Sequence, residues 1–374
     1  MADVIRTVQV QEFPGLVRLL DRSYGSGVGS FERMDPRLYQ PTADACACFH
    51  VLEHNGRIVS HVGLYPIEVV TSGVELTIGG IGAVATMPEE RGNGHMSRLL
   101  HHAVEVMRER HYPLSWLGGN RQRYNAFGWE LAGISYHVTL SRRSLDRAAV
   151  EPVPVQEVFP WEAEALIERL QSTLVCRARR SDLGMYLRKQ GLRVWVAEDG
   201  YLVTHAGWGK PFVAELVSTS GREAGLIRAV MEWASQGEAK CVLSMWDQER
   251  LARLLPAASG WDARSNEMYR IVDLYPLLAA AQPVLERRAA GLRDLDLCFE
   301  IREPDRVDAV TLEVSDGHVR VKPGRDSARV IELTPIAAAR LLLGGPPVGD
   351  SSQIPSQLAA LLPIPVHVPP LSDV

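Results

Sequence analysis

Apolar residues between positions 96 and 107 recur with the spacing of one face of an α-helix. They are Met96, Leu99, Leu100, Ala103, Val104 and Met107, which follow a 3.6-residue period. Pro113 marks a point beyond which this helix does not continue. Just upstream, residues 76–86 read LTIGGIGAVAT, a mostly apolar run that is typical of a central strand. The pattern therefore predicts a strand, a glycine-rich loop and a helix, in that order.

Two other β-rich segments of the chain resemble each other. Asn55-Gly56 lies in the first and Asp199-Gly200 in the second, which reads EDGYLVTHAGW over residues 198–208. Asn-Gly or Asp-Gly between β-rich runs predicts a hairpin with a type I′ turn. His61 and His205 occupy matching places, and we interpret them as structural echoes of one ancestral unit, although a functional role stays open. The sequence thus predicts a duplicated α/β domain with a junction near residues 141–158.

The last part of the chain has a different order of elements. Strand patterns come first, over residues 295–301, 307–315, 318–322 and 329–333. A helix is then predicted, with Thr334 as its N-cap, Pro335 as its first residue and Gly344 past its end. This order is typical of an α+β module. From Pro346 the chain is rich in Pro and Ser and has no periodicity, which predicts a loop or a disordered tail.

Length and composition limit the classes of protein. The chain has 374 residues, and we predict three domains over residues 1–145, 146–285 and 286–374. The formal net charge of −5 argues against a general attraction to nucleic acid. No run of about 18 apolar residues occurs, so we expect no membrane span. The N-terminus lacks the pattern of a secretory signal.

The five cysteines are scattered along the chain. An odd number without pairing order fits reduced thiols, so we expect a cytoplasmic protein. Cys46 and Cys48 form a C-x-C, but no second Cys or His pair stands at zinc-ligand spacing. We therefore predict no metal site.

The glycine-rich loop has the features of a phosphate-binding site. A helix N-terminus presents unpaired N–H groups and a partial positive charge, which attract phosphate. Gly92 and Gly94 remove side chains that would block a close approach, and Arg91 can add a charge-assisted hydrogen bond.

Two other phosphate-binding motifs fit less well. The P-loop requires a Gly-Lys-Ser/Thr ending, which this loop lacks. Residues 80–85 match the weak dinucleotide fingerprint G-x-G-x-x-A. That match would start a helix near Gly82 and place Pro88 inside it.

The loop Arg91-x-x-Gly94-x-Met96, after a strand that ends at residues 84–86, resembles motif A of the GNAT superfamily of acyl-CoA-dependent N-acetyltransferases. The family usually has Gly or Ala where this chain has Met96. The resemblance implies acetyl-CoA as the cofactor. It places the cofactor at Val84, Ala85, Thr86, Arg91, Gly92, Asn93, Gly94, His95, Met96, Ser97 and, on the facing strand, Asn120.

A second motif follows the next predicted strand. Tyr124 precedes Phe127-Gly128-Trp129, an arrangement that resembles the partner motif of these acetyltransferases. The resemblance implies that Tyr124 is the general acid that protonates the departing CoA thiolate. A phenol with a pKa of about 10 can give a proton to a thiolate held close to it.

The whole chain resembles the enhanced-intracellular-survival (Eis-type) acetyltransferases. The second unit keeps the strand and helix of the fold but lacks motif A. The fold class implied is α/β (α+β), with two tandem GNAT-like domains followed by a domain that resembles a sterol carrier protein. The resemblance also implies that the C-terminal carboxylate, here that of Val374, reaches the active site and serves as base. Family members often end in an aromatic residue, and Val374 departs from that pattern.

The implied reaction is acetyl transfer to a primary amine, such as a polyamine, an aminoglycoside-like compound or a lysine side chain. Such cations favour an acidic, aromatic-lined pocket. Candidate lining residues are Asp21, Tyr24, Phe31, Glu32 and Trp116. The resemblance also implies a homo-oligomer, with hexamers among the known assemblies.

Two other functions stay open. The chain could be a non-enzymatic binder of acyl-CoA or lipid that uses its sterol-carrier-like end. It could also be an aminoacyl-tRNA-dependent transferase, a class that needs a basic surface which a net charge of −5 does not suggest.

Overall fold

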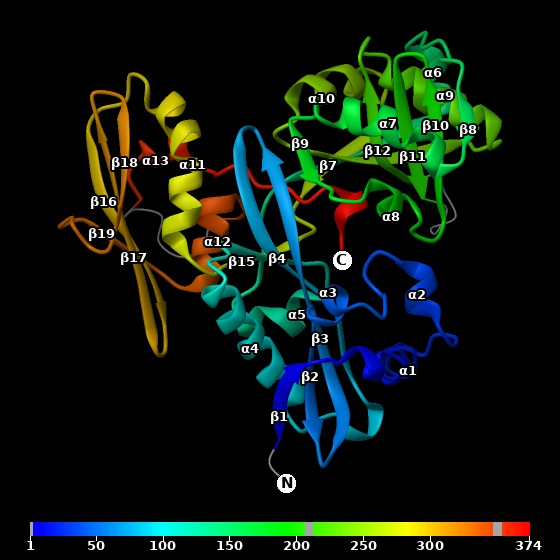
Figure 1. Cartoon of the computed structure of the whole chain (residues 1–374). Helices are drawn as coiled ribbons and strands as arrows, with labels where there is room; N and C mark the ends of the chain where they lie inside the picture. The colour runs from blue at the N-terminus through cyan, green and yellow to red at the C-terminus, as the bar shows by residue number, and fades with distance from the viewer. Residues whose placement is uncertain (1–2, 206–211, 347–353) are drawn as a thin grey trace.

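The computed structural model describes residues 3–205, 212–346 and 354–374, and these residues form three β-sheets with their helices (Figure 1). The fold is mixed α/β, as predicted. We call each sheet with its helices the first, second or third unit. No helix of the described ranges is long and apolar enough to cross a membrane.

The first unit contains an eight-stranded sheet. Its strands, in spatial order, are β1 (Val4–Thr7), β2 (Phe49–His54), β3 (Arg57–Thr71), β4 (Val74–Thr86), β5 (Leu114–Leu117), β15 (Met268–Ile271) and β6 (Glu130–Leu131), while β9 (Cys176–Arg179) pairs with β3. Helix α4 (His95–Glu109) covers one face, and α1 (Phe13–Tyr24) and α2 (Ser30–Met34) lie on the other. Two short helices, α3 (Ala43–Cys46) and α5 (Arg121–Tyr124), complete this unit.

The second unit contains a seven-stranded sheet. Its order is β14 (Gly260–Arg264), β7 (Ser135–Ser141), β13 (Glu238–Ser244), β12 (Phe212–Ser218), β11 (Gly200–His205), β10 (Leu192–Ala197) and β8 (Gln156–Val158). Its helices are α6 (Arg142–Arg147), α7 (Pro160–Gln171), α8 (Leu183–Leu187), α9 (Glu223–Trp233) and α10 (Gln248–Leu254). As predicted, this unit keeps the strand β12 and the following helix α9.

The third unit contains a four-stranded sheet in the order β18 (His318–Pro323), β17 (Arg306–Ser315), β16 (Leu295–Glu303) and β19 (Val330–Leu333). Helices α11 (Leu274–Ala289), α12 (Pro335–Leu343) and α13 (Leu358–Leu361) belong to the same apolar core. The four predicted strands are confirmed. Thr334 is the N-cap of α12, and its hydroxyl accepts a hydrogen bond from the amide of Ala337 at 3.2 Å.

The sheets interlock across the predicted domain boundaries. Strand β7 precedes residue 145 but pairs with β13 and β14 of the second sheet. Conversely, β9 and β15 come from beyond residue 145 and pair with strands of the first sheet. The sheets therefore do not divide at residue 145, and the domain boundaries at 145 and 285 stay predictions.

The local predictions have mixed outcomes. Helix α4 and the hairpin at Asn55-Gly56 are confirmed. The hairpin near Asp199-Gly200 forms, but its predicted turn is wrong, because Gly200 is the first residue of β11. A Cβ atom on Gly200 would lie 2.2 Å from the carbonyl oxygen of Val217, so close packing rather than turn geometry requires this glycine. Residues 206–208 of the second predicted segment lie outside the described residues.

Of the two predicted alternatives for the C-terminal tail, a loop or a disordered segment, the described residues form mainly an ordered loop. Residues 347–353 lie outside the described part, but residues 354–374 are not a disordered tail. Ile364, Val366 and Val368 are buried in the core of the third unit, and the amide of Ile364 donates to the carbonyl of Leu342 at 2.7 Å. The segment then runs to a C-terminus that lies between the first and second units (Figure 1).

A buried carboxylate joins the first unit to the third. Glu130 in β6 has no exposed surface. It accepts from Arg121 Nε and Nη2 at 2.5 and 2.6 Å and lies 3.1 Å from Arg340 Nη2 of α12. Burial opposes ionisation, but hydrogen bonds from Arg121 and Leu131 and the charge of Arg340 outweigh it and lower the pKa of Glu130.

We predict that Glu130→Gln destabilises the protein by about 1–3 kcal/mol at pH 7, because a charged hydrogen-bond acceptor is lost from a buried site. A lowered pKa stabilises the fold above the ordinary value of 4.5, and this contribution is lost as the pH falls through the folded-state pKa. The urea midpoints of variant and wild type should therefore converge as the pH falls below 4.5. Glu105→Gln is the control, since Glu105 is an exposed partner of Arg108. A difference that persists unchanged to pH 3 contradicts the prediction.

Candidate active site

In the first unit, two parallel strands pair over a short stretch and then separate. Strands β4 and β5 pair only at Gly79–Ser115, Gly80–Trp116 and Ile81–Leu117. β5 ends at Leu117, whereas β4 continues to Thr86. We call the space where these strands separate the first wedge. In it, no strand of the described ranges pairs with the β5 side of residues 82–86. Side chains take up part of this edge, because the carbonyls of Val84 and Thr86 accept hydrogen bonds from Tyr24 and Arg91.

A β-bulge shapes the open part of β4. The pairing of β3 with β4 shifts register near Val62, and Ala83 has φ 46°, in the left-handed region. His61 Nδ1 lies 2.8 Å from the carbonyl oxygen of Ala83. Burial lowers the pKa of His61 to about 4, so the ring is neutral at neutral pH and donates from Nδ1 in this hydrogen bond. His61 therefore holds the bulge, which agrees with a structural role.

The glycine-rich loop leads directly into α4. Gly94 is the N-cap at φ 75° and Gly92 has φ 87°, and neither would bring a Cβ atom within 4 Å of a neighbour. Gly94 has no side chain to cap the first amides of α4. These open amides at a helix N-terminus fit a pyrophosphate group.

The side chains of the loop have other partners. Arg91 donates to the carbonyls of Ser23 at 3.0 Å and Thr86 at 3.4 Å. The side-chain amide of Asn93 donates from Nδ2 to the carboxylate of Glu90 at 3.3 Å. The ring of His95 is buried, with its centroid 5.8 Å from that of His54. The loop therefore offers backbone groups more than side chains, while Met96 and Ser97 are half-buried in the first turn.

A cavity of about 540 Å³ lies in the first wedge. It brings together several predicted residues from distant parts of the chain: Tyr24 of α1, Phe31 of α2, Val84 of β4, Tyr124 of α5 and the C-terminal Val374. The remaining lining residues are Ser26, Ser30, Met34, Tyr39, Ile81, Gly82, Ala83, Gly118 and Gln190. The hydroxyl of Tyr24 donates to the carbonyl of Val84 at 3.1 Å, which ties α1 to the open edge.

Tyr124 ends helix α5 and is 7% exposed. A Cβ atom on Gly119 would lie 2.7 Å from its ring, so Gly119 makes room for the phenol. Burial raises the pKa of Tyr124, and the charge of Arg123 opposes this only in part. The phenol therefore stays protonated at neutral pH, the state required of a proton donor.

Val374 lies directly against the backbone of β4. A Cβ atom on Gly82 would lie 2.8 Å from the carboxyl carbon of Val374, and one on Gly80 would lie 2.7 Å from its Cγ2. Both glycines thus make room for the chain terminus. Sequence reasoning missed this role, although the signal was present in the G-x-G of residues 80–82.

Other predicted residues have different surroundings. Asp21 is buried, and its carboxylate accepts from the amide of Gly29 and the hydroxyl of Ser30, each at 2.7 Å. Glu32 is exposed and does not line the cavity. Trp116 lines a separate cavity of about 560 Å³. Asn120 caps α5 by accepting from the amide of Gln122 at 2.9 Å.

The described residues contain no group of three or more His, Cys, Asp and Glu side chains that could hold a metal ion. Thr86 and Ala85 lie at the end of β4 beside the loop, and the side chain of Ala85 packs with the α1 core. The first wedge is thus built from backbone edges, aromatic rings and hydroxyl groups.

Comparison with known proteins agrees with this geometry. Residues 4–132 match the family described as acetyltransferase (GNAT) domain. No curated protein matches the chain. The following solved structures share the fold over most of the chain.

A GCN5-related N-acetyltransferase from Kribbella flavida has a TM-score of 0.70 at 20% identity, covering 92% of this chain and 91% of that one. A conserved protein of Enterococcus faecalis V583, described as a probable N-acyltransferase, has a TM-score of 0.68 at 16% identity, with 92% and 90% covered. Eis1 from Mycobacterium abscessus has a TM-score of 0.65 at 15% identity, with 92% and 90% covered. Residues 4–132 thus resemble a GNAT acetyltransferase domain, and the chain shares its fold with these solved structures over most of its length.

Proposed function

We propose that the protein transfers an acetyl group from acetyl-CoA to a primary amine. The observation that carries the proposal is the meeting of Tyr124 and the C-terminal Val374 in one cavity beside the open edge of β4. A proton donor and a terminal carboxylate, which is a proton acceptor, therefore line the same space.

Backbone groups would hold the cofactor. Acetyl-CoA supplies the acetyl group as a thioester. The open amides between Gly92 and Ser97 would bind its pyrophosphate. The edge of residues 84–86, which has no strand partner on its β5 side, would use its backbone N–H groups to hold the pantetheine arm and polarise the thioester carbonyl.

Two groups of this chain would move the protons. The carboxylate of Val374 accepts a proton from the attacking amine, directly or through water. As the new C–N bond forms and the C–S bond breaks, Tyr124 gives its phenol proton to the sulfur. Val374 thus gains one proton from the amine, and the sulfur gains one proton from Tyr124. The raised pKa of Tyr124 keeps its proton available at neutral pH.

The cavity lining favours a particular class of amine. Aromatic rings and hydroxyl groups predominate, and the carboxylate of Val374 is the one full charge on the described lining residues. Asp21 and Glu32, the expected acidic contacts, do not line it. We therefore propose an acceptor with a single amine on an apolar or aromatic body, in preference to a polycation.

Finer features of the resemblance belong to the same proposal. They are Eis-type specificity, the likeness of the third unit to a sterol carrier protein, assembly into a homo-oligomer and a cytoplasmic location. The fold shared with Eis1 supports the first of these at the level of architecture.

We predict that Gly94→Ala raises the Kd for CoA about five- to thirtyfold in isothermal titration. An alanine at φ 75° carries about 1–2 kcal/mol of strain, and the loop relieves it by turning its amides away. Gly291→Ala is a matched control, because Gly291 has φ 79° and equally open surroundings, and it lies in the third unit. An equal loss in both variants would show that the effect is not specific to the loop.

We predict that Tyr124→Phe lowers kcat about 10²- to 10⁴-fold, the usual contribution of a general acid. The KM for acetyl-CoA should change little, since the phenol acts on the leaving sulfur. Tyr24→Phe removes a second phenol from the same cavity and should lower kcat less than about tenfold. If Tyr24→Phe has the larger effect, the general acid is assigned to the wrong residue.

We predict that acetyl-CoA and an aromatic monoamine release free thiol, with a kcat/KM at least about tenfold above that of spermidine. Thiol release over a panel of amines, followed with a disulfide reagent, makes the measurement. Release with spermidine as the best acceptor contradicts the assigned class of amine. Tight CoA binding without release by any amine favours the non-enzymatic acyl-CoA binder.

A further inference from the structure

The second unit repeats the wedge of the first. Strands β12 and β13 are parallel and pair only at Phe212–Lys240 and Val213–Cys241. Beyond these pairs the strands separate, and we call the space between them the second wedge. The first wedge holds a cavity of about 540 Å³. In the second, a space of about 40 Å³ remains beside His367, and a cavity of about 560 Å³ is lined by Phe212 and Ala214 of β12 and by Lys240 and Val242 of β13.

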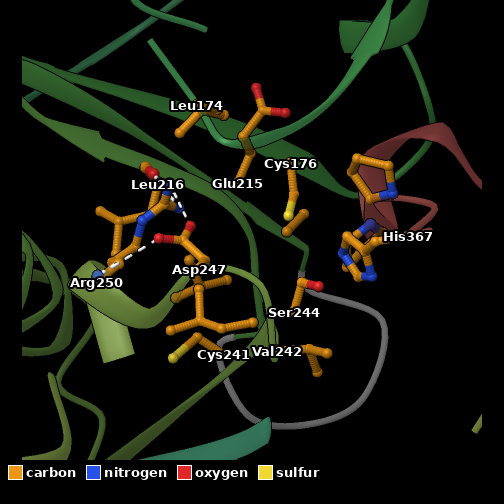
Figure 2. Close-up of a pocket in the computed structure, with 15 residues that line it drawn as sticks. Leu174, Cys176, Glu215, Leu216, Cys241, Val242, Ser244, Asp247, Arg250 and His367 are labelled. Atoms are coloured by element: carbon orange, nitrogen blue, oxygen red, sulfur yellow. Dashed lines mark hydrogen bonds and ion pairs between the residues drawn. The ribbon is translucent and has the colours of Figure 1, made fainter. Parts of the chain in front are cut away.

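The C-terminal tail lies along the second wedge and occupies part of it. His367, Pro369 and Pro370 line the small remaining space together with residues of β12 and β13. Figure 2 shows His367 on the ribbon of the tail, across from Ser244 of β13 and Cys176 of β9. Burial lowers the pKa of His367 to about 4, so this ring is neutral in the wedge at neutral pH.

The next two tail residues are bound by the core of the second unit. Leu371 packs among apolar residues of that core. The hydroxyl of Ser372 has no exposed surface and accepts from Nε and Nη2 of Arg180, each at 3.3 Å. Arg180 is itself held by Glu215 of β12, at 2.6 and 3.0 Å. Ser372 of the tail is thus bound by a guanidinium group whose position Glu215 fixes.

Cations from both units hold the last peptide. Arg37 Nη2 donates to the carbonyl of Asp373 at 2.8 Å. Lys189 forms an ion pair with the carboxylate of Asp373. Both cations also contact the buried Asp35, at 3.2 Å from Arg37 and 3.7 Å from Lys189. Val374 follows directly, against Gly80 and Gly82 of β4.

We propose that the second wedge is a binding site for the chain's own residues 367–372, and that Lys189, Arg37 and Arg180 are positioning residues for the carboxylate of Val374. The inference rests on the proposed role of that carboxylate. The second unit then has a definite role, because it holds the tail at the place where the first unit would hold acetyl-CoA.

Lys189→Met tests the inference, because it removes the ion pair to Asp373 and leaves Arg180 and Glu215 in place. A broad-specificity carboxypeptidase, with mass spectrometry as the readout, measures how fast Val374 is released from the native protein. We expect release to rise about five- to tenfold, as for loss of a partly buried ion pair. We expect kcat to fall about tenfold or more, because small displacements of a reacting group are costly, with the KM for acetyl-CoA unchanged.

Two further variants make the test specific. Lys189→Arg keeps the cation and should restore both values to near those of the wild type. Lys322→Met removes a lysine that pairs with Glu313 and Asp326 on the third sheet, and it should change neither. If Lys189→Met leaves the release of Val374 unchanged, the positioning role is overturned.

A protein with a C-terminal amide, made by ligation, separates this inference from the proposed function. Faster release in Lys189→Met, together with full kcat in the amide, supports the positioning of the tail and contradicts the base role of the carboxylate. Faster release together with a loss of kcat in both proteins supports both.

Discussion

Parallel strands that separate after two or three residue pairs are the constraint on which this molecule depends. Each separation exposes backbone N–H and C=O groups that have no strand to pair with. β4 and β5 create one such place, and β12 and β13 create another. An open edge of this kind must be covered by a ligand, by water or by another segment of the protein. The first wedge is left open as a cavity, and the second is covered in part by the chain's own tail.

A residue with positive φ and two glycines lie on β4 beside the open wedge. Ala83 has a positive φ that is uncommon for a residue with a side chain, and the hydrogen bond to buried His61 holds it there. Such strain persists only where the surroundings fix it, and it is typical of functional sites. Gly80 and Gly82, on the same strand, leave space for the C-terminus. The bulge and the glycines together let one strand carry backbone groups for a ligand on its edge and the chain terminus on its face.

Features set by near neighbours in the sequence could be predicted. The period of α4, the turn at Asn55-Gly56 and the cap at Thr334 depend on residues within a few positions of one another. Features set by distant partners could not. Asp21 has the charge of a substrate contact, but the loop before α2 uses its carboxylate. Trp116 lies in register with Gly80 but lines the other cavity with Glu267 and Asp373, and β15, far along the chain, pairs with its strand. Tyr124 and Val374 were found through resemblance, and the fold brings them together.

The G-x-G of residues 80–82 shows how a local signal can have a distant cause. Read locally, it matches a weak dinucleotide fingerprint, yet these residues lie inside β4 and not at the start of a helix. The structure gives a steric reason instead, since side chains at Gly80 and Gly82 would overlap Val374. The length of the tail is fixed by the same contacts. Residues 371 and 372 are bound in the second unit and residue 374 lies on β4, so only one residue spans the two. The two steps from residue 372 to residue 374 reach at most about 7 Å, which leaves little slack between the second wedge and the first.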